Sequence, residues 1–148
     1  MIKTTIGEIL RDKAEDLDTT DCYLYVIRDG DTVFYVGQSR RGVINRVLEH
    51  LGRGQRPSVD KVTRLMHSNM PESLGWTVEL RKPHYHTHVR SPNEKDLAKL
   101  PEDLRTFACA DFSFHSPLDV DRTERDLIHQ LRPVLNVTYN RDPTPMPK

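Results

Sequence analysis

Side chains that could act on a phosphate ester gather in the first third of the chain. Tyr25 and Tyr35 stand ten positions apart, on either side of an Asp-Gly turn near residue 30. A tight hairpin at this turn would place the two phenols opposite one another on neighbouring strands. In the next segment Arg46, His50 and Arg53 have the i, i+4, i+7 spacing of one helix side. The group would suit a phosphate-ester site, and sheet packing with a solvated helix face explains it equally well.

A further candidate is an acid inside an apolar helical pattern near the C-terminus. The segment 119–132 has an apolar stripe made of Val120, Leu127, Ile128 and Leu131. Glu124 falls within this stripe, four residues from both Val120 and Ile128. A carboxylate on a buried face is costly unless a cation, a metal or several hydrogen bonds compensate it. A structural arginine partner and a bound divalent cation are both open explanations.

The elements that must position these residues alternate between strand and helix patterns. Strands are predicted at 22–28, 32–37 and 75–82. Helices are predicted at 5–17, from 43 to about 51, from Pro57-Ser58 to about Met70, and at 119–132. Residues 1–21 then form an N-terminal helical segment packed on a domain of residues 22–139. An irregular acidic insertion occupies about 83–117, and the proline-rich tail 140–148 is predicted to be disordered.

The composition indicates one globular domain in a reducing compartment. The chain has 148 residues, no net charge and 36% apolar residues, which is enough for a hydrophobic core. No apolar run approaches the roughly 20 residues of a membrane span, and no signal-peptide pattern opens the chain. The two cysteines are too few for a disulfide scaffold. We expect a cytoplasmic protein with no membrane partner.

The neutral total hides one basic stretch. Between Gln38 and Met66 there are two acidic residues and seven basic ones, namely Arg40, Arg41, Arg46, Arg53, Arg56, Lys61 and Arg64. A basic surface attracts nucleic-acid backbones, although a chance cluster on a solvated face is also consistent with the pattern. Candidate backbone contacts are Arg40, Arg41, Arg53 and Lys61.

A run of histidines offers a separate site for consideration. His84, His86 and His88 would project from one face of an extended chain, and imidazoles bind transition metals well. No Cys-x-x-Cys or second compact His pair accompanies them, as a structural zinc site would usually require. The pattern favours a polar, substrate-facing loop and leaves metal binding by these histidines open.

Several of these residues occur in an order that resembles the GIY-YIG nuclease superfamily. Tyr23-Leu24-Tyr25 stands at the first signature tripeptide and Tyr35-Val36-Gly37 at the second, and Arg46 follows eleven residues after Tyr35. The closing motif is similar to Glu-x-x-Leu-Ile-x-x-Leu-x-Pro-x-Leu-Asn, which runs from Glu124 to Asn136. His50, four residues after Arg46, is similar to an arrangement in restriction enzymes of this superfamily.

The chain departs from the superfamily pattern at three points. Tyr23 replaces the first glycine of the first tripeptide, a position that concerns backbone fit rather than chemistry. The insertion at 83–117 is longer than a minimal member needs. No separate DNA-binding domain is visible, so the resemblance does not explain substrate choice.

The resemblance implies a fold and a reaction. The fold would be α+β, a small three-stranded antiparallel sheet flanked by helices, and the reaction phosphodiester hydrolysis supported by one divalent metal, Mg²⁺ or Mn²⁺. Glu124 would offer this metal a hard oxygen, with waters and a phosphate oxygen completing the octahedron. Arg46 would hold the scissile phosphate and offset the charge that develops in the transition state.

The remaining site residues would handle protons and positions. Tyr25 would orient and deprotonate the attacking water, which requires nearby cations to lower its pKa from about 10. Tyr35 would hydrogen-bond the same water or the phosphate, and the two tyrosines could exchange roles. His50 would assist proton transfer or contact the phosphate, and Asn136 would fix Glu124 or the substrate. We expect these groups to converge in one cleft with basic rims.

The expected partner is DNA, with RNA not excluded, bound by a monomer or a transient homodimer. A non-cleaving nucleic-acid-binding module on the same fold is the alternative, and a purely structural or protein-interaction domain is a third. A binding module has no need of the carboxylate at Glu124, which favours the nuclease. The sequence gives neither the substrate's sequence or structure nor the biological pathway.

Overall fold

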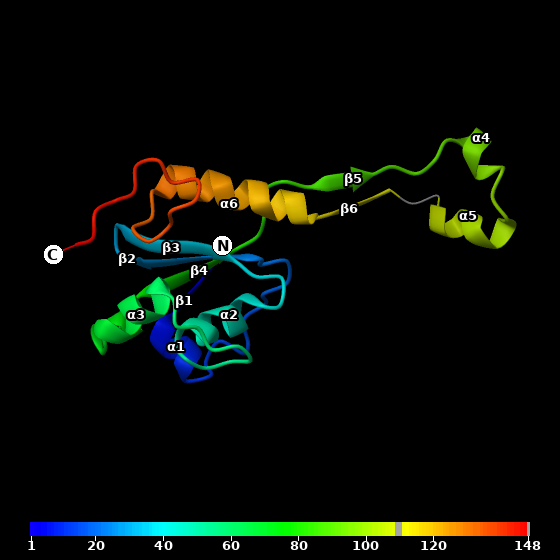
Figure 1. The fold of residues 1–148 in the computed structure, drawn as a ribbon. Coiled ribbons are helices and arrows are strands. Elements are labelled where there is room, and N and C mark those ends of the chain that lie inside the picture. The colour runs from blue at the N-terminus through cyan, green and yellow to red at the C-terminus, as the bar shows by residue number, and fades with distance from the viewer. Residues whose placement is uncertain (109–110, 148) are drawn as a thin grey trace.

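The main sheet of the molecule has four strands. The computed structural model, described over residues 1–108 and 111–147, is a mixed α+β structure (Figure 1). Its strands are antiparallel and lie in the order β1 (Ile2–Thr5), β4 (Thr77–Arg81), β2 (Leu24–Asp29) and β3 (Thr32–Gln38). The α+β class and the antiparallel hairpin are confirmed. The prediction of three strands is wrong, because β1 adds a fourth beside β4.

The strand that the sequence pattern did not reveal is β1. It pairs along β4 from Ile2 opposite Leu80 to Thr5 opposite Thr77. Thr5 is also the N-cap of α1 (Ile6–Leu10), since its hydroxyl accepts the Glu8 N–H at 3.1 Å. The helix predicted over 5–17 therefore ends at Leu10, and residues 11–16 form turns. A four-residue strand that runs straight into a helix cap is too short to show an alternating pattern.

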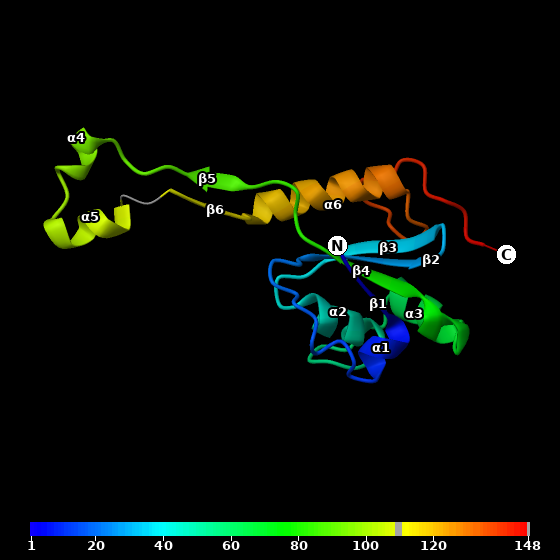
Figure 2. The same cartoon turned by 180° about the vertical axis from the view of Figure 1, so that it is seen from behind.

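Helices cover both faces of the sheet (Figures 1 and 2), and an apolar core lies on each face. On one face, α1, α2 (Val43–His50) and α3 (Lys61–Ser68) pack against side chains of β2, β3 and β4. The short η1 turn (Glu72–Gly75) leads from α3 into β4. On the other face lies α6 (Pro117–Leu131), whose Val120, Leu127 and Ile128 pack against Leu24, Val26, Val33 and Val36. The edge strand β3 thus lies between α2 and α6.

Helix α3 begins later in the sequence than the pattern indicated. Its N-cap is Asp60, whose carboxylate accepts the Thr63 N–H at 3.0 Å, and not Pro57-Ser58. Val59, which lies before this cap, is 88% exposed, while Val62 and Met66 within the helix are buried. By contrast, α2 lies where it was predicted, and Gly52, with a positive φ of 80°, follows its end.

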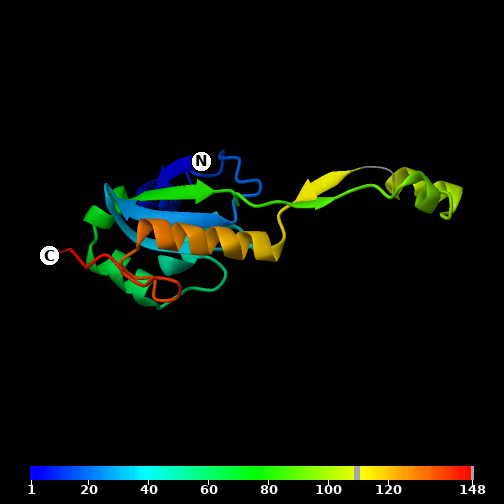
Figure 3. The same ribbon diagram turned by 90° about the horizontal axis from the view of Figure 1, so that it is seen from above.

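The predicted insertion at 83–117 is a projecting arm (Figure 3). Strands β5 (Thr87–Val89) and β6 (Phe112–Phe114) form its stalk, and α4 (Glu94–Leu97) and α5 (Glu102–Ala108) lie at its far end. The stalk is tied to α6, where the Thr87 hydroxyl donates to Asp119 at 2.7 Å. Neither α4 nor α5 buries a residue, so the arm adds nothing to the two cores.

The tail predicted to be disordered forms no helix or strand over residues 140–147. Its first part nevertheless has contacts with the end of α6. Asn140 donates to the carbonyls of Pro133 and Asn136, and Arg132 pairs with Asp142 at 3.0 Å. In the described part of the chain, every helix is too short or too polar to cross a bilayer.

Candidate active site

The two phenols meet at the β2–β3 pair, although they are not directly opposite. Tyr25 pairs with Gly37, and Tyr35 pairs with Ile27, because the register shifts at a bulge after Ile27. The tyrosine ring centroids are 6.0 Å apart. A Cβ on Gly37 would lie 2.4 Å from the Tyr25 hydroxyl. The predicted proximity is confirmed, the predicted direct pairing is wrong, and Gly37 is required because the Tyr25 ring lies over it.

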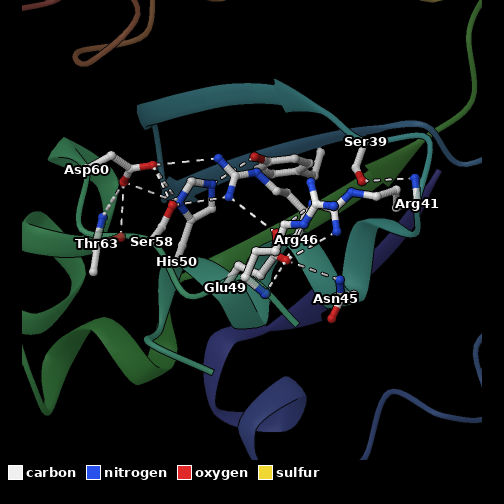
Figure 4. Close-up of polar contacts among 11 residues, drawn as sticks. Ser39, Arg41, Asn45, Arg46, Glu49, His50, Ser58, Asp60 and Thr63 are labelled. Carbon is white, nitrogen blue, oxygen red and sulfur yellow. Dashed lines mark hydrogen bonds and ion pairs between the residues drawn. The ribbon is translucent and has the colours of Figure 1, made fainter. Parts of the chain in front are cut away.

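A buried hydrogen-bond chain runs from Tyr25 to the start of α3. The Tyr25 hydroxyl lies 2.9 Å from His50 Nε2, and both side chains are almost fully buried, with 1% and 0% exposure. On its other side, His50 Nδ1 lies 3.2 Å from an oxygen of Asp60. The imidazole therefore links a phenol of the sheet to a carboxylate at the N-cap of a helix (Figure 4). The His50 ring is thus hydrogen-bonded to Tyr25 and is not exposed to solvent.

The electrostatics of the phenols differ from the expectation. Burial raises the pKa of Tyr25 well above its usual value, Tyr35 adds to the effect, and Arg46 opposes it without prevailing. Burial and the Glu124 carboxylate likewise raise the pKa of Tyr35 against Arg46. The prediction that cations lower the pKa of Tyr25 is therefore wrong, because loss of hydration outweighs the guanidinium. As a base, Tyr25 needs an acceptor for its own proton, and His50 is placed to be that acceptor.

Arg46 lies in a network of acids on its own side of the sheet (Figure 4). Its guanidinium contacts Glu49 at 3.5 Å, the Ser58 hydroxyl at 3.2 Å and Asp60 at 3.6 Å. The side chain keeps 25% of its surface exposed. Arg46 is thus oriented by neighbours and still accessible, as a phosphate-binding guanidinium must be.

Glu124 is a carboxylate with an unmet hydrogen-bonding need. Its Oε2 is buried and has no hydrogen-bond partner among the described residues. Burial and the neighbouring Asp121 carboxylate raise the pKa of Glu124, and the nearby Gln38 side chain of β3, whose amide donates to Asp121, only partly opposes this. The arginine partner that would explain Glu124 structurally is absent from its contacts in the described part of the chain.

The donor chemistry of Glu124 fits a single hard cation. A buried carboxylate oxygen without a proton donor is the kind of ligand that Mg²⁺ or Mn²⁺ accepts. Within the described residues, however, three or more His, Cys, Asp or Glu side chains nowhere gather in a metal-binding arrangement. A metal at Glu124 would therefore take its other ligands from water and from the substrate.

Arg46 and Glu124 come from opposite layers of the molecule. Arg46 lies on α2 and Glu124 on α6, with the edge strand β3 between them. They do not contact each other directly, and instead both act electrostatically on the Tyr25 and Tyr35 phenols. Both charges lie near enough to the phenols to affect their pKa values, while convergence of all these groups in one cleft stays a prediction.

Asn136 has a different role from the predicted one. Its amide accepts the Val36 N–H and donates to the Val36 carbonyl, both at 2.9 Å. It therefore binds the edge of β3 as a neighbouring strand would, and does not contact Glu124. Of the two predicted roles of Asn136, fixing Glu124 is wrong, because the amide is bonded to the backbone of Val36, and contact with a substrate stays a prediction. Asn136 stabilises the strand that carries Tyr35.

The four basic residues predicted to contact nucleic acid differ in whether another side chain of the protein contacts them. Arg41 donates to Glu49 at 3.1 Å, and Arg40 lies over the Tyr23 ring at 5.2 Å. Arg53 is exposed but follows Gly52, so it does not continue the α2 stripe as predicted. Lys61 is exposed and lines a cavity of about 300 Å³ together with Tyr35, Asp60 and Asn136. This cavity opens beside the second phenol.

The histidines of the run do not gather around one point in the described structure. His84 pairs with Asp126 at 2.9 Å, and the His86 ring lies 4.6 Å from that of His115. Only residues 87–89 are extended as a strand, so the three imidazoles do not share one face as predicted. His84 and Tyr85 both hydrogen-bond Asp126, which fixes the base of the arm to α6.

Sequence reasoning missed two acids that organise the site. The Asp60 carboxylate contacts His50 and Arg46 and accepts a hydrogen bond from the Ser58 hydroxyl. The Glu49 carboxylate accepts hydrogen bonds from Arg41, Asn45, Arg46 and the Arg56 N–H. The signal for Asp60 was an aspartate three residues before Thr63, which is an N-cap pattern. For Glu49, the spacing from Arg46 indicated only a surface ion pair.

Comparisons with protein-family models, with curated proteins and with solved structures each find no match.

Proposed function

We propose that this protein is a metal-dependent endonuclease that hydrolyses phosphodiester bonds in DNA. The observation that carries the proposal is the buried, unpartnered Oε2 of Glu124, whose charge acts on the Tyr25 and Tyr35 phenols together with that of Arg46. The fully buried acids of the described chain, Glu49, Glu79 and Asp119, all have hydrogen-bond donors. A structural acid would be expected to have them too. An acid that lacks them is explained by a cation that arrives with the substrate.

The protein's own groups divide the work of hydrolysis. Tyr25 would take a proton from the attacking water while its phenolic proton passes to His50 Nε2, 2.9 Å away. Tyr35 would hold the same water or a phosphate oxygen at the rim of the adjoining cavity. Arg46 would bind the scissile phosphate, since it is oriented by acids and partly exposed.

Glu124 would hold the metal, and the metal, when bound, supplies charge neutralisation at the phosphate and the leaving oxygen. Burial makes a bare carboxylate at this position unfavourable. A bound cation would offset the free-energy cost of this charge. Metal affinity and substrate affinity should therefore depend on each other, because water and phosphate oxygens complete the coordination shell.

The second candidate is a module of the same fold that binds nucleic acid without cutting it. The exposed basic residues Arg40, Arg53 and Lys61 favour binding in either case. A binder, however, gains nothing from a phenol hydrogen-bonded to a buried neutral imidazole. This hydrogen bond favours the enzyme.

A plasmid-nicking assay separates the candidates. The wild-type protein is incubated with supercoiled plasmid, with duplex and flap oligonucleotides and with RNA, in Mg²⁺ and in EDTA, next to Glu124→Ala. The nuclease predicts Mg²⁺-dependent cleavage that is lost in Glu124→Ala. Retention of DNA without cleavage would support the binding module. If the protein neither bound nor cut any polynucleotide, both candidates would be overturned.

A further inference from the structure

The side chain behind His50 has a role that the nuclease proposal does not assign. Asp60 faces His50 Nδ1 at 3.2 Å, on the side of the ring opposite to Tyr25. We propose that Asp60 is a positioning residue that fixes His50 in the Nδ1–H tautomer and so keeps Nε2 as the proton acceptor for Tyr25. Its consequence for turnover rests on the proposed nuclease function, whereas its effect on the His50 ring does not.

The position of Asp60 is fixed by several donors. Its carboxylate accepts the Thr63 N–H and the Thr63 hydroxyl, each at 3.0 Å, and the Ser58 hydroxyl at 3.2 Å. Burial would raise the pKa of Asp60, but the Thr63 N–H and the neighbouring His50 outweigh burial and lower it. The group that faces His50 is thus an ionised carboxylate, which can only accept hydrogen bonds.

The tautomer follows from this geometry. Burial and Arg46 lower the pKa of His50 against the opposing effect of Asp60, so its imidazole is neutral and carries one ring proton. Because the Asp60 carboxylate has no proton to give, that single proton lies on Nδ1. Nε2 then has a free lone pair directed at Tyr25, and the phenol donates to it. Without Asp60, the ring could place its proton on Nε2 and leave the phenol without an acceptor.

The protons balance in the resulting step. The attacking water gives a proton to the Tyr25 oxygen as its own oxygen bonds to phosphorus, and the phenolic proton moves to His50 Nε2. The P–O bond to the leaving oxygen breaks, and this oxygen departs with the bonding electron pair and takes a proton from solvent. The transient imidazolium is stabilised by Asp60 on one side. The charged and titratable groups around the ring are Asp60 from α3, Arg46 and Glu49 from α2, Tyr25 from β2 and Tyr35 from β3.

Asp60 also caps α3 and contacts Arg46 at 3.6 Å, so a simple loss of activity would not identify its role. Asp60→Ser keeps the helix cap, because serine caps a helix about as well as aspartate, and serine is too short to reach the imidazole. It also removes the Arg46 contact, so the ring signals of His50, and not the rate, identify the positioning role. The matched control is Thr63→Ala, which removes one hydrogen bond of Asp60 and leaves the Asp60–His50 pair intact.

The experiment records the ring ¹⁵N signals of His50 by NMR and, in parallel, kcat and KM for plasmid nicking. In Asp60→Ser we expect the ring proton to move from Nδ1 towards Nε2, and kcat to fall on the order of 100-fold with KM little changed. Thr63→Ala should keep the wild-type tautomer and lose less than about threefold in kcat.

Unchanged ring signals in Asp60→Ser would overturn the proposal, whatever the rate. A tautomer change without any loss of kcat would overturn the catalytic part of it. If the wild-type protein cut no polynucleotide, the nuclease function would fail, and the ring signals alone would still decide whether Asp60 sets the tautomer of His50.

Discussion

Two acids on helices that face the sheet, Glu49 on α2 and Glu124 on α6, have opposite surroundings. Glu49 is fully buried, and it accepts hydrogen bonds from Arg41, Asn45, Arg46 and the Arg56 N–H. Burial would raise the pKa of Glu49, but the Arg41 and Arg56 hydrogen bonds outweigh it and lower the pKa. The pKa of Glu124 is raised by burial, and its Oε2 has no partner among the described residues.

The difference shows what distinguishes a structural acid from a functional one. Glu49 is fully buried, and Glu124 is partly buried with its Oε2 atom enclosed, so loss of hydration alone does not separate them. Glu49 has its full set of donors in the folded protein and needs nothing else. Glu124 is left with a deficit that folding does not correct, and a bound cation would correct it.

The largest effect that tests this contrast is on cleavage. Glu124→Gln removes the charge that would hold the metal, and we expect nicking to fall by about 10³-fold. The melting temperature in EDTA should stay the same or rise, because a buried charge without a partner is lost. Thermal unfolding and nicking assays on the same preparation check both. Wild-type cleavage by Glu124→Gln would remove Glu124 from the mechanism.

The second effect falls on stability. Glu49→Gln leaves the Arg41 and Arg46 guanidiniums without their shared partner and weakens the loop that ends with the Arg56 N–H. We expect the melting temperature to fall by about 5–10 °C, with a smaller loss of cleavage than in Glu124→Gln, through a less ordered Arg46. A normal melting temperature would contradict the structural role of Glu49.

The two acids should also give opposite pH dependences. A lowered folded-state pKa means that Glu49 contributes stability above its unfolded value of about 4.3, and that this is lost as the pH falls. A raised folded-state pKa means that Glu124 contributes stability only at low pH, and that this contribution is lost as the pH rises through that pKa.

Relative to wild type in EDTA, Glu124→Gln should therefore gain stability between about pH 4 and 7, and Glu49→Gln should lose it over the same range. Urea unfolding at several pH values measures both differences. Two variants whose stability changed with pH in parallel with the wild type would show that neither acid titrates differently in the folded and unfolded states.

The sequence predicted the part of the site that follows from local pattern. The hairpin carrying Tyr25 and Tyr35, the position of Arg46 and His50 on α2, and Glu124 inside an apolar stripe all have periodic signals. These signals depend on residues close in sequence, and the structure places the elements where the pattern put them.

The rest depends on contacts between distant segments. The bulge after Ile27 moves Tyr35 away from its expected partner. Asn136 bonds to the backbone of Val36, a hundred residues away. The Asp60–His50 pair arises because α3 begins at residue 60, and a boundary error of a few residues hid it. β1 was missed because four residues show too little alternation.

The smallest expected effect is on the salt dependence of DNA binding, for which the exposed Arg53 is compared with Arg41, which is paired with Glu49. Arg53 is exposed and, in the described part of the chain, has no carboxylate partner, whereas Arg41 donates to Glu49. A free guanidinium can neutralise a phosphate and release a counterion, while a paired one first has to leave its acid. Arg53→Ala should therefore reduce the slope of log K against log salt by about 1, and Arg41→Ala should reduce it less. Binding titrations on duplex DNA between low and moderate salt give both slopes. Equal slopes for wild type and Arg53→Ala, with turnover lost at every salt concentration, would place Arg53 in the chemistry instead of in the binding surface.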